Sequence, residues 1–257
     1  MLIKSILKTA QPFLTGRKVR DLVIGISLMA VELDNGFLGV SYVLREGLKS
    51  GCSIFPYGQK VIGEEASSIA GWAESGRDNV QRGIGTAVLA AASRAQDMED
   101  VETPDRPFGV DLKKTDTMAM IGFIAPLVQM FSSRVKKLYI FDEGISKCGG
   151  FKGEVVLMKE QPRILPHADI VMLSGTSIIN GSAEEIISMC EKAREIIMIG
   201  ASTPMYPEAF LDTPVTILAG SWWKKEYKKE LFKKISLACG ITELSEYVIK
   251  KAVKVSH

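Results

Sequence analysis

Residues 169–181 read DIVMLSGTSIING, an apolar run that breaks into a small polar loop. A helix-like segment follows from residue 182 to residue 194. A continuous apolar run between turn residues is typical of a strand that is buried on both faces, as in parallel sheets. In open α/β sheets, ligands bind where such strands hand over to helices. The stretch therefore predicts a fold class and a place for a ligand site.

The same rhythm of strand, loop and helix repeats through the second half of the chain. Such alternation predicts a doubly wound, mainly parallel, Rossmann-like sheet. A polar segment with two prolines, residues 98–111, precedes it, so we expect a domain boundary there, with domains at 1–108 and 109–257. The five expected strands are 117–123, 135–141, 170–173, 196–199 and 215–218.

The first half has strands before helices, which predicts a small α+β domain. Asn35-Gly36 separates two strand-like runs, 19–33 and 37–44, and such a pair is a strong hairpin signal. Helices are expected at 2–10, 64–74 and 79–97, the last with Asn79 as its N-cap. Gly83 and Gly85 each cost this helix about 1 kcal/mol relative to alanine, so we expect close packing there.

The composition is that of an ordinary soluble globular protein, with 46% hydrophobic and 24% charged residues. A formal net charge of +2 gives no case for nucleic-acid binding. No apolar run approaches the roughly 20 residues that span a bilayer. The N-terminal segment is short and amphipathic, which favours a helix over a signal peptide and predicts a cytoplasmic location.

Soft metal ligands are sparse. The four cysteines are far apart, without a C-x-x-C pair, and His167 is the one interior histidine. Cys190 and Cys239 lie in helical patterns and are expected to be buried. Cys52 and Cys148 lie in loops flanked by glycine, where reactivity or soft-metal binding remains an alternative. The spacing therefore assigns no metal site.

Small and polar residues gather at the expected strand ends, where glycines permit close backbone approach and hydroxyls offer hydrogen bonds. Helix N-termini at the same edge favour anions. Ordinary capping and turn formation is the alternative explanation. The candidate ligand-binding residues are Gly122, Asp142, Ser174, Gly175, Thr176, Asn180, Gly200 and Ser202. Glu64 and Glu65 join them if the two domains face each other; otherwise these acids complement a helix dipole.

Standard catalytic and cofactor motifs are absent. Asp142 occupies the place of a ribose-binding acid in a dinucleotide fold, but residues 120–126 contain a single glycine instead of G-x-G-x-x-G. There is no G-x-S-x-G elbow, no P-loop, and no evident histidine partner for Ser202. The sequence therefore names no reaction and no cofactor.

The C-terminal part predicts an amphipathic helix over residues 221–240. Its apolar face carries Trp223, Tyr227, Leu231, Ile235 and Ala238. A basic face of this kind is usually solvated; contact with an acidic partner, a ligand or a membrane surface is the alternative. The lysines of that face are Lys224, Lys225, Lys228, Lys229, Lys233 and Lys234.

Three segments together resemble the "putative heavy-metal chelation" family, a group of largely uncharacterised bacterial and archaeal proteins. They are LPHAD at 165–169, SGTSIING at 174–181 and GASTPMYP at 200–207. The Asn35-Gly36 hairpin and Gly83-Ile84-Gly85 match the family's companion N-terminal domain. The resemblance covers nearly the whole chain and implies an enolase-N-terminal-like domain followed by a Rossmann-like domain, with a ligand crevice between them.

Three functions are compatible with these patterns. The favoured one is a protein that binds a small anionic or metal-chelating molecule in that crevice. The second is an enzyme that makes or modifies such a chelator, with Asp142, Glu64 or Glu65 as acid, base or ligand anchor. The third is an oligomeric scaffold whose loops only cap helices. The identity of the ligand, a directly bound metal and the oligomeric state stay open.

Overall fold

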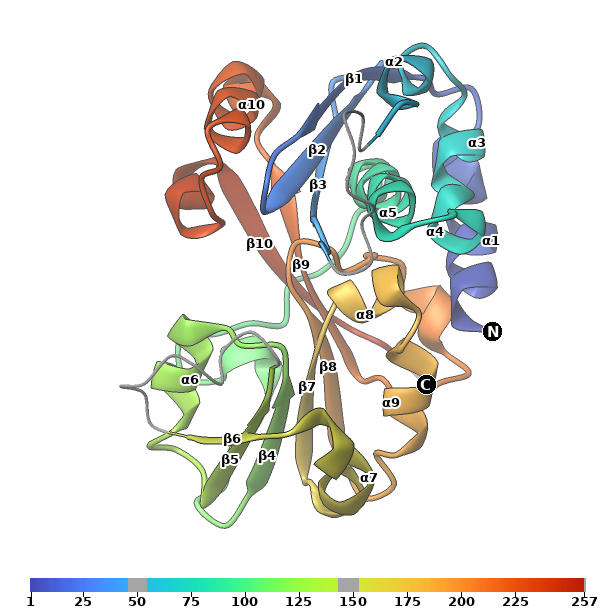
Figure 1. Ribbon diagram of the computed structural model, residues 1–257. Helices are drawn as coiled ribbons and strands as arrows, with labels where there is room; N and C mark the ends of the chain where they lie inside the picture. Colours follow the sequence, from blue (N-terminus) through green and yellow to red (C-terminus); the bar gives the residue numbers. More distant parts are fainter. Residues whose placement is uncertain (46–54, 143–152, 257) are drawn as a thin grey trace.

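Two β-sheets organise the computed structural model, which describes residues 1–45, 55–142 and 153–256 (Figure 1). The first is antiparallel, in the order β1-β2-β3, and the second has the order β10-β9-β8-β7-β4-β5-β6. The strands are β1 Val19–Ile24, β2 Leu28–Leu33, β3 Leu38–Tyr42, β4 Thr117–Ile121, β5 Lys137–Phe141, β6 Glu154–Val156, β7 Ile170–Ser174, β8 Glu195–Ile199, β9 Ile217–Trp223 and β10 Val248–Lys254.

Helices cover both sheets. The α-helices are α1 Leu2–Leu14, α2 Gly58–Val61, α3 Ala66–Ala70, α4 Trp72–Ser75, α5 Asn79–Ser93, α6 Ala125–Phe131, α7 Gln161–Ile164, α8 Thr176–Asn180, α9 Ala183–Ser188 and α10 Lys228–Ser236. Short 3-10 helices include η1 Pro107–Gly109, η3 Leu165–His167, η4 Pro207–Phe210, η5 Lys225–Tyr227 and η6 Thr242–Tyr247. None of the described helices is both long enough and apolar enough to cross a bilayer.

The large sheet has the doubly wound topology that the sequence predicts. From β4 the chain moves outward through β5 to β6, returns to the other side of β4 as β7, and continues through β8 to β9. The pairs from β6 to β9 are parallel, and β10 closes the β9 edge in the antiparallel direction. The direction of winding therefore reverses between β4 and β7.

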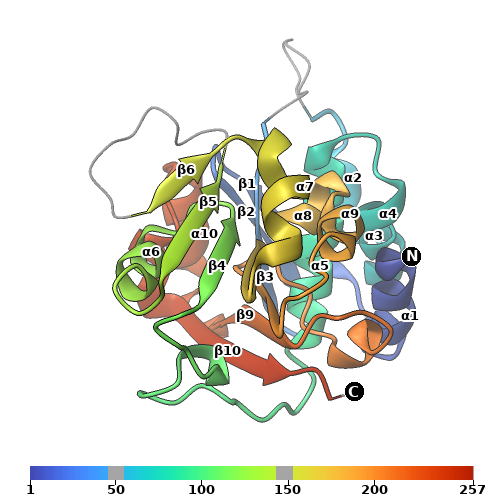
Figure 2. The ribbon, with the colours of Figure 1, turned by 90° about the horizontal axis from the view of Figure 1, so that it is seen from below.

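The central strands are buried on both faces, because helices pack on each side of the sheet. Met118 and Met120 of β4 face the cluster that contains α6 and η1. Ala119 and Ile121 face the opposite cluster, with residues of α7, α9 and η4. Figure 2 shows α6 on one side of β4 and β5 and α7 on the other. This burial explains the continuous apolar runs.

The antiparallel sheet confirms the Asn35-Gly36 hairpin. Gly36 adopts φ +82°, and the Phe37 N–H donates to Asn35 Oδ1 at 3.1 Å. The expected run 19–33 is two strands, β1 and β2, joined by a turn at residues 25–27. Gly25 in this turn passes directly against the Ile235 carbonyl of α10, where a side chain does not fit.

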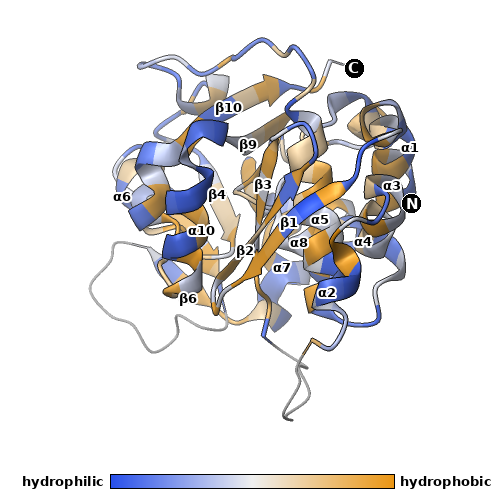
Figure 3. Cartoon of the chain, turned by 90° about the horizontal axis from the view of Figure 1, so that it is seen from above, coloured by the Kyte–Doolittle hydropathy of each residue, from blue (hydrophilic) through white to orange (hydrophobic). Residues whose placement is uncertain are grey.

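Helix α5 packs on one face of this sheet and α10 on the other (Figures 1 and 3). The close packing expected at Gly83 and Gly85 is confirmed. A Cβ at Gly83 would lie 2.9 Å from Met29 Cε of β2, and one at Gly85 would collide with the backbone at Ala73 of α4. Helices α1, α3 and α4 cover the outer side of α5.

Three local expectations are wrong. The N-cap of α5 is Asp78, whose carboxylate accepts the Gln81 N–H at 2.8 Å, so Asn79 is already helical. The segment 182–194 is not one helix: only α9, Ala183–Ser188, is helical, and Gly181 at φ +78° separates it from α8. The helix expected over 221–240 is shorter, because Trp223 still pairs with Val248 as part of β9.

One hydrophobic cluster joins the two halves of the chain. It contains Ile84 and Ala87 of α5 together with Ile178 of α8 and Phe210 of η4. The expected boundary between residues 108 and 109 falls within η1 and stays a prediction.

Candidate functional site at the carboxyl edge of the parallel sheet

The parallel strands end in register. Ile121 of β4 pairs with Phe141 of β5 and with Leu173 of β7. The next residues, Asp142, Gly122 and Ser174, therefore lie in one row across three strands, with about 4.8 Å between neighbours. The register places three of the sequence-predicted residues side by side at the point where the winding reverses.

Gly122 permits a close approach between β4 and β7. It adopts φ +89°, and its N–H donates to the Phe141 carbonyl at 2.8 Å. A Cβ at this position would lie 3.0 Å from Ser174 Cβ, closer than side chains ordinarily pack. The absence of a side chain therefore leaves Ser174 room beside the β4 end.

Ser174 and Thr176 present a pair of hydroxyl groups. Their oxygens are 2.8 Å apart, and both residues are half-buried. Gly175 between them packs against the peptide of Ser202 and Thr203, where a Cβ would lie 2.5 Å from Thr203 N. The two hydroxyls are thus held together on a turn that cannot shift toward β8.

Asp142 joins the ends of β4 and β5, because its Oδ2 accepts the Phe123 N–H at 2.8 Å. In a dinucleotide fold, the turn after the first strand offers its amides to the pyrophosphate. Here one of those amides is already paired with a carboxylate. The negative charge at this position disfavours a second anion there and agrees with the missing G-x-G-x-x-G motif.

The loop after β8 links this edge to the antiparallel sheet. Ser202 is buried, and its Oγ accepts the N–H of Tyr42, the last residue of β3, at 3.0 Å. Ser202 therefore has a structural partner. Gly200 adopts φ +116°, and its Cβ position has no atom within 4 Å, so the backbone beside it is unobstructed.

Three of the sequence-predicted residues lie outside the row. Asn180 is exposed, and its Oδ1 accepts from Ser182 N–H at 3.1 Å and Ser182 Oγ at 2.8 Å, which caps the turn before α9. Glu64 and Glu65 are exposed beside the start of β1, where Glu65 pairs with Lys18 at 3.6 Å. Because β1 and β3 run in the same direction, these acids lie one strand length, about 17 Å, from the Tyr42 end of the sheet.

Soft-metal ligands do not converge. No group of three or more His, Cys, Asp or Glu side chains that could hold a metal occurs among the described residues. Cys190 is buried and donates to the Ile186 carbonyl at 3.1 Å, and burial raises the pKa of its thiol to about 12. His167 ends η3, at the amino end of β7. Cys52 and Cys148 lie outside the described residues. The described side chains do not fit a thiolate or imidazole metal cage.

Two cavities lie away from the strand ends. One of about 530 Å³ opens between α1, α9 and η4, with Glu184, Cys190 and Thr213 among its lining residues. The other, of about 280 Å³, lies near Asp111 and Arg134. Neither is lined by a residue that the sequence analysis assigns to the site.

The structure adds residues that the sequence analysis missed. Tyr42 reaches the edge through its N–H, and burial raises the pKa of its phenol. Thr203 Oγ1 and Ser177 Oγ are buried and have no hydrogen-bond partner within the described part of the chain. Thr203 and Ser177 belong to the quoted loop motifs, so the sequence could have identified them as candidate site residues. Tyr42 could not be identified in this way, because its position depends on how the two sheets pack.

Comparisons with known proteins agree on one family description for both parts of the chain. Models with the description "Putative heavy-metal chelation" match residues 8–93 and 107–254. An uncharacterised protein of Methanocaldococcus jannaschii is 26% identical over 149 residues, which is 56% of this chain and 55% of that protein. The chain thus matches about half the length of this curated relative.

Two solved structures share the fold over nearly the whole chain. A Pyrococcus horikoshii protein of unknown function, from the family matched at 107–254, has 21% identity and a TM-score of 0.80, covering 99% of this chain and 100% of its own. A Desulfitobacterium hafniense protein of unknown function from the same family has 17% identity and a TM-score of 0.72, covering 98% of each chain. At these identities the likeness shows the fold.

Proposed function

The chain belongs to the family with the description "Putative heavy-metal chelation", and we propose that it binds a small anionic or metal-chelating organic molecule at the carboxyl edge of its parallel sheet. The observation that supports this proposal most is the reversal of winding between β4 and β7. In open α/β sheets such a switch point is where ligands bind. Here it coincides with Gly122 and with the Ser174–Thr176 hydroxyl pair.

The proposed site has a centre and two flanks. Gly122 and the turn Ser174-Gly175-Thr176 form the centre, with Asp142 on one side and Gly200 on the other. Ser202 supports the site by fixing the β8 loop to Tyr42. Asn180, Glu64 and Glu65 are left out, because the side chains of Asn180 and Glu65 have partners elsewhere and Glu64 lies beside Glu65 at the start of β1.

The chemistry of these groups favours a ligand with several oxygens. Serine and threonine hydroxyls donate to anionic oxygens and accept from hydroxyl or amino groups. Asp142 accepts only, so it suits a donor or a cation carried by the ligand. Since the described thiols and imidazole do not converge, a heavy metal would come already bound to an organic chelator. From the sequence we also propose a cytoplasmic location.

A thermal-shift screen tests the proposal. The purified protein is heated with metal ions, nucleotides, S-adenosylmethionine and organic acids, and with mixtures of the acids and metals. A ligand present at 100 times its dissociation constant stabilises by about 2.7 kcal/mol, which is readily measured. We expect an organic acid, alone or with its metal, to raise the melting temperature.

The Thr176→Val variant locates the bound compound. It removes one hydroxyl at nearly constant shape, so we expect folding to persist and the ligand-induced shift to fall. Thr213→Val is the matched control, since Thr213 is equally half-buried but lines the cavity beside α1. An undiminished shift in Thr176→Val, or a loss only in Thr213→Val, would move the ligand away from the switch point.

A further inference from the structure

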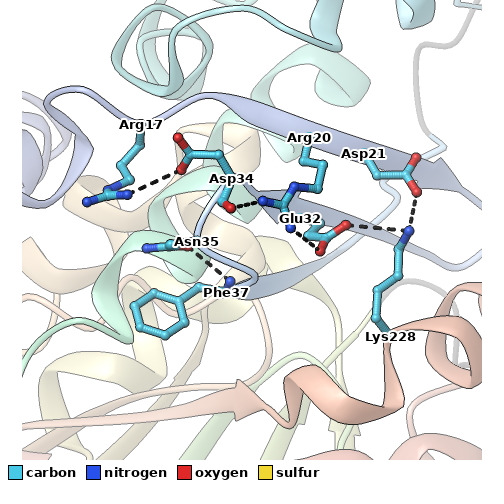
Figure 4. A network of polar contacts seen from close by, with 8 residues as sticks. All are labelled: Arg17, Arg20, Asp21, Glu32, Asp34, Asn35, Phe37 and Lys228. Carbon is cyan, nitrogen blue, oxygen red and sulfur yellow. Dashed lines mark hydrogen bonds and ion pairs between the residues drawn. The ribbon is translucent and has the colours of Figure 1, made fainter.

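Helix α10 is fixed to the outer face of the antiparallel sheet. Leu231 and Ile235 are buried against it. Lys228 forms ion pairs with Asp21 of β1 and, at 3.4 Å, with Glu32 of β2, which also pairs with Arg20 (Figure 4). These contacts determine which side of the helix is left to solvent.

The solvent side of α10 carries Lys229 and Lys233, and Lys225 of the preceding η5 and Leu237 at the C-cap continue the same four-residue spacing. All four are exposed. Within the described residues, none of these three lysines has a carboxylate within ion-pair distance, although Glu226 and Glu230 occupy the neighbouring positions of the same segment. Residues at this spacing lie next to one another on a helix surface, so Lys229 and Lys233 are adjacent, and Lys225 at the start of the segment adds a third lysine without an ion-pair partner.

The basic charge of the chain is concentrated in this region. Residues 224–254 contain nine lysines, four glutamates and no arginine. The chain as a whole carries a formal charge of only +2, so its remainder is acidic on balance. Three of these lysines, at positions 250, 251 and 254, lie on β10, so the charge presented beside α10 is that of the exposed row Lys225, Lys229 and Lys233.

Two exposed aliphatic side chains lie at the carboxyl end of α10 and in the turn between β1 and β2 that contacts it. Leu237 is 63% exposed and Ile26 58% exposed. Their segments are in contact, because Gly25 packs against the Ile235 carbonyl. Leu237 is held out by the end of the helix, where Ala238 N–H donates to Ile235 O at 3.0 Å and Cys239 N–H to Lys234 O at 3.1 Å. The carboxyl end of α10 thus adds exposed aliphatic side chains to the row of lysines.

We propose that the surface formed by Lys225, Lys229, Lys233, Leu237 and Ile26 binds the surface of an anionic lipid membrane. Lysines with adjacent aliphatic residues are the combination by which surface helices associate with anionic lipids. A nucleic acid is a poorer fit, because its phosphates and bases favour the planar arginine fork, which this region lacks. A nucleic acid in water would leave Leu237 and Ile26 without an apolar partner, whereas the two side chains can enter the lipid interface.

Vesicle sedimentation tests the proposal with the full chain. We expect binding to vesicles that mix phosphatidylcholine with phosphatidylglycerol, none to phosphatidylcholine alone, and a decrease as salt increases. A lysine near such a surface contributes about 1 kcal/mol, or about fivefold in affinity. The double variant Lys229→Glu/Lys233→Glu should therefore bind at least about 20 times more weakly. Leu237→Ser should weaken binding without changing its salt dependence.

The matched control is Lys8→Glu/Lys192→Glu, which changes the net charge equally at two exposed lysines outside the surface. It should bind as the unchanged protein does. Equal losses in both double variants, or no binding to the anionic vesicles at low salt, overturn the proposal. Retention of an acidic peptide or an oligonucleotide through Lys229 and Lys233, without vesicle binding, overturns it in favour of that partner.

Discussion

Gly122 combines a positive φ with a close side-chain neighbour at the centre of the proposed site. Gly122→Ala places a side chain at φ +89° and brings its Cβ to 3.0 Å from Ser174 Cβ. We expect a loss of about 1–2 kcal/mol from the backbone conformation alone, and a further loss from the contact. Urea unfolding measures both.

Gly16→Ala is the control that separates the cost of the backbone conformation from the cost of the contact with Ser174. Gly16 has a similar φ of +70°, but no atom lies within 4 Å of its Cβ position. The Gly122 variant should therefore be the less stable of the two, and it alone should lose ligand affinity. Equal destabilisation of both variants would show that the β4 and β7 ends do not approach as described.

The ion pair between Asp116 and Arg194 ties the amino ends of β4 and β8. Arg194 donates to both Asp116 oxygens, at 2.9 and 2.6 Å, and Asp116 is 2% exposed. Burial alone would raise the pKa of Asp116, but the hydrogen bonds from Arg194 and from the Lys113 N–H bring it below its ordinary value of 3.8. The pair therefore stabilises the fold above that value, and its contribution disappears as the pH falls through the lowered pKa.

Asp116→Asn should cost about 2 kcal/mol at neutral pH, because it removes charged hydrogen bonds at a buried site. The difference in urea midpoint between variant and unchanged protein should shrink once the pH falls below about 4. Asp111→Asn serves as the control: its pair with Arg106 is exposed and should contribute little. A difference for Asp116→Asn that does not vary with pH would contradict this role.

At the scale of the element, one substitution at the carboxyl end of α10 should increase the stability of the protein. Its hydrogen bonds, Cys239 N–H to Lys234 O and Ala238 N–H to Ile235 O, form a Schellman motif, whose C′ position usually holds glycine. Here alanine occupies it at φ +63°. We expect Ala238→Gly to stabilise the protein by about 0.5–1 kcal/mol, since glycine is not strained in this conformation. A lower thermal midpoint in the variant would contradict the assignment.

Elements that bury both faces were predictable from the sequence, and elements at the edges were not. The five expected strands correspond to β4, β5, β7, β8 and β9, because burial on both sides leaves continuous apolar runs. The edge strand β6 has three residues, and β10 interrupts its apolar pattern with lysines. Neither carries that signal. Trp223 was assigned to a helix because its spacing fits the apolar face of one, and its pairing with Val248 is a long-range contact that local spacing does not reveal.

At the scale of the whole molecule, the candidate site was predictable only where the sheet itself places residues. Gly122, Asp142 and Ser174 follow strands whose parallel register aligns them. Whether Glu64 reaches the site depends on the orientation of a different sheet. Whether the Asn180 side chain is available depends on a local cap, in which it accepts from Ser182. The sequence pattern does not encode the packing of one sheet on the other, so it could not show that Tyr42 reaches Ser202.

The sparse soft ligands lead to a prediction about metal. The protein should not retain stoichiometric zinc, nickel or copper after dialysis, because its described thiols and imidazole are dispersed. Metal should be retained when an organic chelator is added, and Thr176→Val should reduce that retention. Metal analysis of dialysed samples, with and without the chelator, measures both. One equivalent of tightly held metal without a chelator would contradict the proposal.

A crystal structure of the protein with the compound that stabilises it most tests the central claim directly. The account predicts density for that compound at the ends of β4 and β7, within hydrogen-bond distance of the Ser174 or Thr176 hydroxyl. Density in the cavity between α1, α9 and η4 instead, with the switch point unchanged, would contradict it.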